Sequence, residues 1–186
     1  ADAAGLVVYS TVPTSAQVYV GDREYFDHHR QAATDELFIS PPLKSSTLDQ
    51  WVLLLTRPVL RQGQFEGVVW LSVSPDYLAS TLARQPADKG DVSSLLFLSG
   101  HYAARSADLD KVLGTQLAAD TSFLKAGAPA QGSRRARAQA DQQDRIYGWR
   151  RLLGHPMVLT VALDEATVLQ PVNRDIALAA ERNLLL

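Results

Sequence analysis

The chain has 186 residues, of which 46% are hydrophobic and 20% are charged. This composition is typical of a folded globular protein and excludes an intrinsically disordered one. The formal net charge of −2 gives no electrostatic reason to expect nucleic acid as a partner. There is no cysteine, which excludes disulfides and thiolate chemistry. A chain of this length forms one domain or two small ones.

The first half of the sequence predicts a strand, a helix, a polar loop, two further strands and a second helix. Their expected ranges are 4–11, 22–33, 40–50, 51–60, 65–73 and from Ser74 onward. Asp22 is a suitable N-cap for the first helix, because its carboxylate accepts from free amides of the first turn. The two β-rich runs flank a turn that contains Gly63, which is typical of an antiparallel hairpin.

Two faces of this predicted hairpin carry polar and aromatic side chains. Trp51 and Arg57 share one face of the first strand, and Trp70 and Ser72 share one face of the second. A sheet face with an arginine, a serine and two tryptophans is suited to line a small polar pocket. The alternative is that Arg57 pairs with a surface carboxylate and both tryptophans are core, because buried arginine is rare without a partner.

The second half repeats this order of elements in shorter form, after a polar segment over 83–91. It predicts strands at 93–99 and 103–106, followed by a helix at 108–125 that is broken at Gly114. Three more strands follow at 133–140, 145–153 and 157–163, and Asp164 caps a C-terminal helix at 164–186. We therefore predict an α/β (α+β) fold of two PAS-like lobes, each a mainly antiparallel sheet flanked by helices. The lobes are placed at 1–84 and 91–163, and the helix at 164–186 is expected to lead to a membrane span.

No catalytic or metal-binding motif is visible in the sequence. His28 and His29 point about 100° apart on a helix, which makes them poor co-ligands for a metal. Ser99-Gly100-His101 predicts a hairpin turn and not a hydrolase site, and no Gly-rich phosphate loop precedes a helix. We expect no metal, no cofactor and no enzymatic activity in this chain.

The basic run Arg134-Arg135-Ala136-Arg137 has two interpretations. It suggests a nucleic-acid patch, but it lacks interleaved aromatic residues, and Asp141 and Asp144 follow closely. A solvated strand face is favoured.

An ordered set of segments between Leu6 and Val172 resembles a known family. The segments are Asp22-Arg23-Glu24-Tyr25-Phe26, a Ser-Pro loop, Trp51-Val52, Thr56-Arg57-Pro58-Val59, Gly63-x-Phe65-x-Gly67-Val68-Val69 and Ser72-Val73-Ser74-Pro75-Asp76-Tyr77-Leu78. In this order they resemble the double Cache (PDC) sensor domains of bacterial diguanylate cyclases (GGDEF proteins), histidine kinases and chemoreceptors. The resemblance is strongest to the sensor domains of diguanylate cyclases.

The resemblance implies an extracytoplasmic, periplasmic domain of an inner-membrane protein, with the first lobe membrane-distal and a cytoplasmic output domain, a diguanylate cyclase. It implies that the full-length protein is membrane-anchored, and a homodimer is an open option. Because the sequence starts without Met and ends in three leucines, we expect this chain to be a fragment. Arg23-x-Tyr25-Phe26 matches the family's Arg-x-Trp-Tyr unit. Arg23 is therefore the implied ligand for a carboxylate, and Tyr25 is the implied aromatic wall.

The position of the family's amine-binding aspartate falls on Ser72, which argues against a free α-amino acid and favours a small organic carboxylate. His29 would add a donor and make binding sensitive to pH. The predicted ligand site comprises Arg23, Tyr25, His29, Trp51, Arg57, Trp70 and Ser72. The alternatives are that Arg23 pairs with Asp27 and that Tyr25 and Phe26 are core.

These residues predict a sensor domain that binds a small anionic ligand in the first lobe and relays the signal through the C-terminal helix. The alternative is a docking module for a periplasmic protein that binds no small molecule. A first lobe filled by Trp51, Trp70 and Phe26 would favour this alternative.

Overall fold

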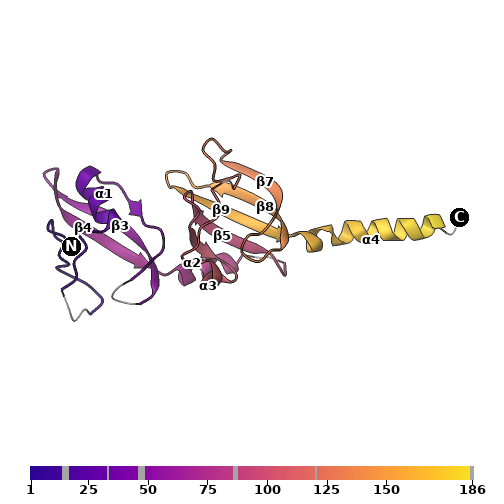
Figure 1. Cartoon of the computed structure of the whole chain (residues 1–186), viewed down its shortest axis with the longest axis horizontal. Coiled ribbons are helices and arrows are strands. Elements are labelled where there is room, and N and C mark those ends of the chain that lie inside the picture. The colour runs from indigo at the N-terminus through magenta and orange to yellow at the C-terminus, as the bar shows by residue number, and fades with distance from the viewer. Residues whose placement is uncertain (14–16, 33, 46–48, 86–87, 120, 185–186) are drawn as a thin grey trace. The chain divides into compact units, whose positions relative to one another are not determined.

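The computed structural model describes residues 1–13, 17–32, 34–45, 49–85, 88–119 and 121–184. The chain divides into two compact units, Ala1–Pro75 and Asp76–Leu186, each with its own antiparallel sheet (Figure 1). The α+β class with two PAS-like lobes is confirmed. The division falls at residue 75 and not after residue 84, because the second predicted helix packs with the second sheet.

The first unit contains one helix and a small sheet built around a central strand. Its elements are α1 (Glu24–Ala32), β1 (Phe38–Ile39), β2 (Leu43–Lys44), β3 (Trp51–Arg61) and β4 (Gln64–Val73). Strand β3 pairs antiparallel with each of the other three strands. Tyr25 and Phe26 of α1 pack with Val52 and Val68 in the core of this unit, so α1 covers one face of the β3–β4 hairpin.

The hairpin turn at Gln62 and Gly63 confirms the predicted connection between β3 and β4. Both residues have positive φ, 52° and 79°, which a two-residue turn needs to match the twist of its strands. Beyond the turn the register shifts, because Leu60 pairs with Phe65 whereas Val59 pairs with Gly67. Glu66 is thus an extra residue, a β-bulge, and it reverses which faces of β3 and β4 lie together.

Two expectations for the N-terminal region are wrong. The predicted strand at 4–11 forms only single bridges, such as Leu6 with Tyr19, and the side chains of Val8 and Tyr9 are exposed. Although this run has high β-propensity, a strand also needs a paired neighbour and a core to cover. Helix α1 begins at Glu24, two residues after the predicted cap Asp22.

The second unit contains a five-stranded sheet in the order β6-β5-β9-β8-β7. Its elements are α2 (Pro75–Ala83), β5 (Val92–Phe97), β6 (Tyr102–Arg105), α3 (Leu109–Val112), β7 (Gln131–Arg137), β8 (Asp144–Arg151), β9 (Met157–Asp164) and α4 (Glu165–Leu184). All predicted strands of this half are confirmed. Ala79 of α2 joins a buried cluster with Leu96, Phe123 and Val158.

The predicted helix at 108–125 is wrong over most of its length. Only Leu109–Val112 is helical, and Gly114 has a positive φ of 75° that ends the helical path. The described residues that follow form turns across the sheet, with Phe123 buried against it.

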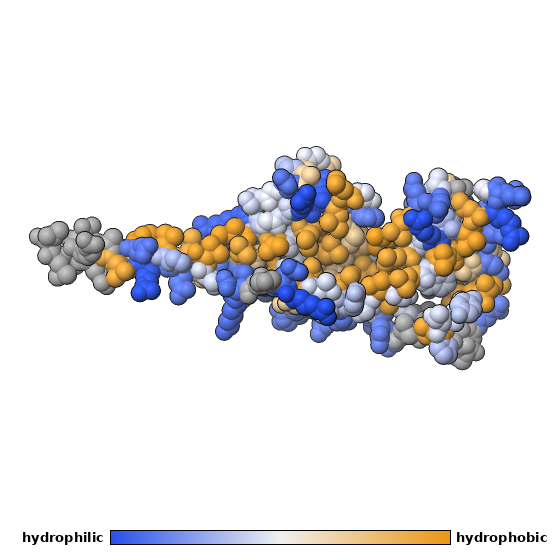
Figure 2. Space-filling model, turned by 180° about the vertical axis from the view of Figure 1, so that it is seen from behind, coloured by the Kyte–Doolittle hydropathy of each residue, from blue (hydrophilic) through white to orange (hydrophobic). Residues whose placement is uncertain are grey.

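Helix α4 begins immediately after β9. Asp164 caps it as expected, because its Oδ1 accepts from the amide of Thr167 at 2.8 Å. Val168, Val172 and Ile176 are exposed, and Figure 2 shows apolar side chains along this helix. Among the described residues, no helix is both long enough and apolar enough to cross a membrane.

Candidate functional site

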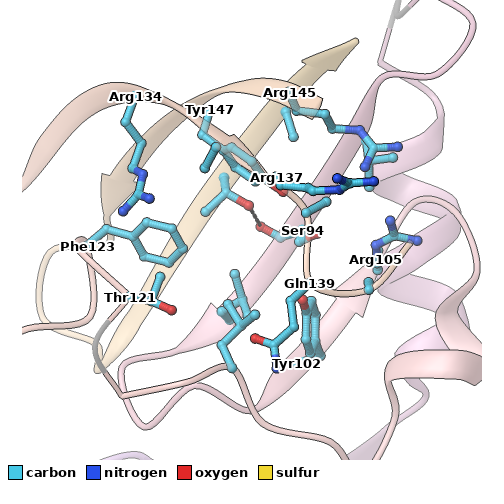
Figure 3. Close-up of a pocket in the computed structure, with 18 of the residues that line it drawn as sticks. Ser94, Tyr102, Arg105, Thr121, Phe123, Arg134, Arg137, Gln139, Arg145 and Tyr147 are labelled. Atoms are coloured by element: carbon cyan, nitrogen blue, oxygen red, sulfur yellow. Dashed lines mark hydrogen bonds between the residues drawn. The ribbon is translucent and has the colours of Figure 1, made fainter. Parts of the chain in front are cut away.

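A cavity of about 240 Å³ lies over one face of the second unit's sheet (Figure 3). The sheet contributes residues from all five strands. The segment between α3 and β7, here called the covering segment, adds Leu117, Thr121 and Phe123, and the β7–β8 loop adds Gln139. Pockets for drug-sized ligands run from about 300 to 1,000 Å³. The cavity therefore suits a small metabolite.

The antiparallel register determines which side chains form the floor of the cavity. Ser94 lies opposite Thr160, and Tyr147 lies opposite Ala162, so these side chains project from one face of the sheet. The hydroxyl of Thr160 donates to the carbonyl of Ser94 at 3.4 Å. Ala136 and Ala162 fill little of this face, which leaves space above the sheet.

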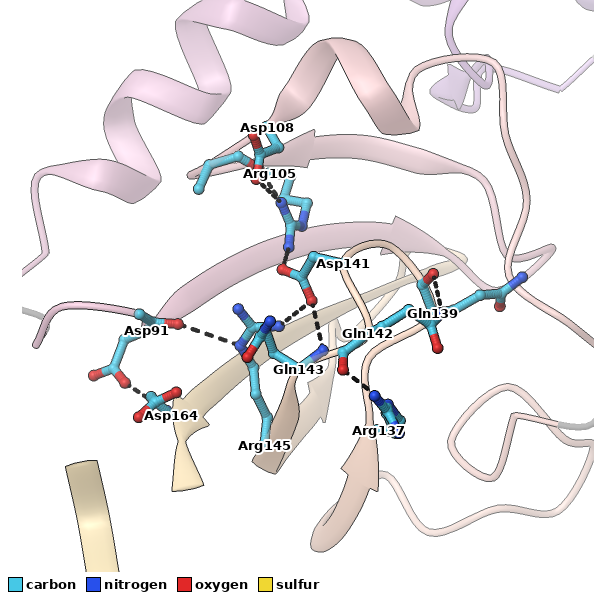
Figure 4. A network of polar contacts seen from close by, with 12 residues as sticks. Asp91, Arg105, Asp108, Arg137, Gln139, Asp141, Gln142, Gln143, Arg145 and Asp164 are labelled. Carbon is cyan, nitrogen blue, oxygen red and sulfur yellow. Dashed lines mark hydrogen bonds and ion pairs between the residues drawn. The ribbon is translucent and has the colours of Figure 1, made fainter. Parts of the chain in front are cut away.

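Two buried arginines share one carboxylate at an edge of the cavity (Figure 4). Arg105, at the end of β6, is 3% exposed, and Arg145 of β8 is 4% exposed. Arg105 Nη2 donates to Asp141 Oδ2 at 2.8 Å, and Arg145 Nη1 donates to Asp141 Oδ1 at 2.6 Å. Arg145 Nε also donates to the carbonyl of Gly90 at 3.2 Å. Both guanidinium groups are thus partnered, which buried charges require.

Carboxylates balance the two buried arginines of this cluster. Burial raises the pKa of Asp141, but hydrogen bonds from Arg145, the Gln143 amide and Arg105 outweigh burial and lower that pKa to about 2. Asp141 is therefore ionised at neutral pH. Arg105 Nη1 also lies 3.6 Å from Asp108 Oδ2, so the two arginines face two carboxylates. Burial raises the pKa of Tyr102 to about 12 and also raises the pKa of Tyr147, so both phenols stay neutral donors.

Two further arginines border the cavity from β7. Arg134 lies beside Phe123, and Arg137 lies near Arg145 on the other side (Figure 3). Arg137 Nε donates to the carbonyl of Gln142 at 2.8 Å. Across the residues that the structure describes, every charged side chain that lines the cavity is an arginine.

The covering segment is fixed to the sheet by side chains of β8. Trp149 Nε1 donates to the carbonyl of Pro129 at 3.2 Å, and its ring centroid lies 5.8 Å from that of Phe123. Arg151 Nη2 donates to the carbonyls of Phe123 and Lys125 at 3.2 and 3.0 Å. These bonds hold the outer wall of the cavity in place.

The structure brings some of the predicted site residues together in the first unit. Tyr25 and His29 of α1 are buried, and the ring of Tyr25 lies 6.1 Å from that of Trp70. His29 Nε2 and Thr56 Oγ1 are 2.8 Å apart. Burial raises the pKa of Tyr25 to about 12 and lowers the pKa of His29. Ser72 is on the same face of β4 as Trp70.

The expectation that Arg57 and Trp51 share a face with Trp70 and Ser72 is wrong. Because of the bulge at Glu66, Trp70 lies opposite Thr56 and Arg57 lies opposite Val69. Arg57 is exposed and its Nη1 lies 3.0 Å from Asp35 Oδ1. The alternative of a surface ion pair is therefore confirmed for Arg57.

Arg23 is also exposed, and its Nε lies 3.6 Å from Asp22 Oδ1. The alternative pairing of Arg23 with Asp27 is wrong, because Asp27 pairs with Arg30. The seven predicted site residues all belong to the first unit, and none lines the second unit's cavity. Their role in ligand binding stays a prediction.

From the sequence, Arg105 is expected to be structural, and the other arginines of the cavity are not predicted as site residues. The basic run of β7 is exposed as expected, but it is more than a solvated face, because Arg134 and Arg137 border the cavity and Arg135 pairs with Glu165. The pattern that could have revealed the site is the two-residue spacing of Arg134 and Ala136 on one predicted strand and of Arg145 and Tyr147 on the next, because these residues pair across the two strands. It would have placed these side chains on one face.

No protein-family model and no curated protein matches the chain. Among solved structures, the extracellular domain of a protein described as a histidine kinase, rpHK1S-Z16, matches with a TM-score of 0.80 and 27% identity. The match covers 90% of this chain and 70% of that domain.

Two chemoreceptor domains share the fold at lower identity. The periplasmic sensory domain of Campylobacter jejuni Tlp1 matches with a TM-score of 0.64 and 15% identity, over 84% of this chain and 61% of that one. The ligand-binding domain of Pseudomonas fluorescens CtaA, solved with L-isoleucine, matches with a TM-score of 0.61 and 14% identity, over 87% and 64%. The chain thus spans less than two thirds of either chemoreceptor domain.

The chain has the fold of Cache-type sensor domains. The resemblance seen in the sequence is confirmed, and this Cache domain is extracytoplasmic. Its structural neighbours are described as extracellular, periplasmic sensory or ligand-binding domains.

Proposed function

We propose that this Cache domain senses a small organic carboxylate in the cavity of the second unit and reports binding to a cytoplasmic output domain of a membrane-anchored protein. The observation that carries the proposal is the charge of the cavity wall. In the described part of the chain, Arg105, Arg134, Arg137 and Arg145 are its charged residues. Arginine suits this task because its planar fork of donors matches a carboxylate.

The neutral wall supports the same ligand class. Tyr102, Tyr147, Ser94, Thr160 and Gln139 offer hydroxyl and amide groups around a small volume. A few well-placed polar groups in a largely preformed cavity are typical of small-ligand sites.

The proposal favours an acid without an amino group. The related domain of CtaA was solved with the amino acid L-isoleucine. Within the described wall of the present cavity, no carboxylate is available to pair with a ligand ammonium group. Asp141, which lies nearby, is already engaged by Arg105 and Arg145.

The output domain of the full-length protein is part of the proposal. The sequence resemblance favours a diguanylate cyclase, and the similarity to rpHK1S-Z16 supports a histidine kinase as the rival. In either case the ligand must favour one arrangement of the sensor by a few kcal/mol to shift its population.

One observation favours the second candidate, a docking module. Phe26 is fully buried, and Val69 and Leu71 are exposed on the face of β4 that lies away from α1. A first unit with a filled core and an exposed apolar strand face suits a protein partner.

The first test is a thermal-shift screen of the chain against organic acids, amino acids and purines. Ligands that bind only the folded state raise the melting temperature, and we expect this for carboxylates. The double variant Arg134→Gln/Arg137→Gln should lose the shift, whereas Arg150→Gln, an exposed arginine of β8 outside the cavity, should retain it.

Two results would contradict the proposal. If Arg23→Gln abolishes the shift and the double variant retains it, the ligand site is in the first unit, as the sequence predicted. If no compound class changes the melting temperature, the docking module is favoured, and capture of periplasmic proteins on immobilised chain is the next measurement.

A further inference from the structure

We infer that the cavity of the second unit selects an anion with two separated acidic groups, a short-chain dicarboxylate. This inference rests on the proposed function, because it assigns a ligand class to the same cavity. Its basis is the placement of Arg134 and Arg137, whose guanidinium groups retain hydrogen-bond donors for a ligand.

The two arginines lie on opposite sides of the cavity. Figure 3 shows Arg134 beside Phe123 on one side, whereas Arg137 lies near Arg105 and Arg145 on the other. Tyr147 and Ser94 lie between them. A ligand with an acidic group at each end matches this separation of charge, but a ligand with one acidic group reaches only one end.

The buried arginines leave little capacity for a ligand. Arg105 is engaged by Asp141 and by the carbonyl of Ala107. Arg145 is engaged by Asp141 and by the carbonyl of Gly90. Asp141 pairs with both arginines, and Asp108 Oδ2 lies 3.6 Å from Arg105 Nη1, so this cluster is balanced and offers few free donors.

The arginines of β7 differ from this buried pair. Arg137 uses its Nε on the carbonyl of Gln142, which leaves its terminal nitrogens for a ligand. Within the described residues, Arg134 has neither a hydrogen-bond nor an ion-pair partner. Both guanidinium groups border the cavity and are therefore available to bind acidic groups.

The space between the two ends suits a short carbon chain. Ala136 and Ala162 contribute only methyl groups, and the neutral ring of Tyr147 adds an apolar surface with one hydroxyl. The volume of about 240 Å³ restricts the chain to a few carbons.

The test compares acids of equal length that differ in the second carboxylate. Calorimetric titrations of the 186-residue chain at fixed ionic strength would use succinate against butyrate and glutarate against pentanoate. A charge-assisted hydrogen bond predicts that each diacid binds about tenfold tighter than its partner, or more. Arg134→Gln and Arg137→Gln should each reduce diacid affinity to that of the monoacid, and Arg150→Gln should leave the preference unchanged.

The outcomes separate this inference from the proposed function. If monoacids and diacids bind equally well and the two variants weaken both, the dicarboxylate inference is overturned and the carboxylate sensor stands. If none of the four acids binds, both are overturned. A diacid preference that survives in Arg134→Gln overturns the assignment of the second acidic group to Arg134.

Discussion

Arg135 of β7 and Glu165, the first residue of α4, form a two-point ion pair. Arg135 alternates with Arg134, so its side chain projects from the face of β7 opposite to the cavity. The side chain of Glu165 is only 11% exposed. The strand that borders the cavity is therefore tied directly to the start of the C-terminal helix.

We expect Glu165→Gln to loosen the first turn of α4 without unfolding the sheet. The substitution removes the charge of Glu165, and the exposed Arg135 is left solvated, so the effect stays local. Hydrogen exchange followed by mass spectrometry should show faster exchange in peptides that span the β9–α4 junction, and unchanged exchange in β5. Asp175→Asn, farther along α4, is the matched control. Equal exchange in all three proteins would show that the ion pair does not hold the helix.

His29 should make the first unit sensitive to mild acid. Burial and the neighbouring His28 lower the pKa of His29 below its usual value near 6.5, so the unfolded chain binds the proton more readily. The stability that the neutral ring provides is present above about pH 6.5 and is lost as the pH falls through the lowered pKa.

Urea unfolding of the wild type should therefore show a lower midpoint at pH 5 than at pH 7.5. His29→Phe keeps a ring but cannot be protonated, and the hydroxyl of Thr56 retains the carbonyl of Phe38 as a partner. We expect a smaller loss of stability on acidification in this variant. His155→Gln, at an exposed histidine, should behave like the wild type. An identical pH response in all three would rule out His29 as the cause.

Asp141→Asn should destabilise the second unit strongly. It leaves Arg105 and Arg145 buried without their shared carboxylate, and loss of one partner from a buried pair costs about 3–5 kcal/mol. Equilibrium unfolding in urea measures this loss, with Asp144→Asn at an exposed site as the control. A difference below about 1 kcal/mol would show that solvent replaces the carboxylate.

The acid response of Asp141 lies in another pH range from that of His29. Its pKa is lowered from 3.8 to about 2, so its contribution to stability is present above about pH 4 and is lost as the pH falls towards 2. Acid unfolding of the second unit should follow this range in the wild type. The Asp141→Asn variant should lack that component, and an unchanged acid profile would contradict the assignment.

Gly132→Ala should disturb the wall of the cavity through Trp149. A Cβ on Gly132 would lie 2.5 Å from Trp149 Cζ2, so the indole must move. This overpacking is expected to cost about 1–3 kcal/mol. The near-ultraviolet circular dichroism of Trp149 should change, because its ring would leave Phe123 and Pro129. Gly148→Ala, where an added Cβ meets nothing within 4 Å, is the control.

The hairpin shows both what the sequence predicts and where prediction fails. The strands and their turn follow from two β-rich runs around Gly63. With uninterrupted pairing from Leu60 and Phe65, Arg57 would have lain opposite Val68 and on the same face as Trp70. A single extra residue, Glu66, reverses this relationship. The local signal for such a bulge is Gly67, an isolated glycine inside the second β-rich run.

The cavity was harder to predict than the strands around it. Arg105, Asp141 and Arg145 come from β6, a connecting loop and β8, so their contact depends on the strand order. The covering segment has little regular structure, and its apolar residues resemble a helix in their spacing. Tertiary contacts with the sheet, such as the burial of Phe123, determine its path.

Strand β9 ends at Asp164 and helix α4 begins at Glu165, with no residue between them. Such a junction has no flexible linker, so a small rotation of the strand end is passed on to the helix. A 20-residue helix is about 30 Å long, so a tilt of about 5° at its base would displace its far end by about 2–3 Å. A helix that stays rigid through Pro171 would thus act as a lever arm whose fulcrum lies at Asp164. A small rotation at the sheet edge would become a movement of about two carbon–carbon bond lengths at the tip.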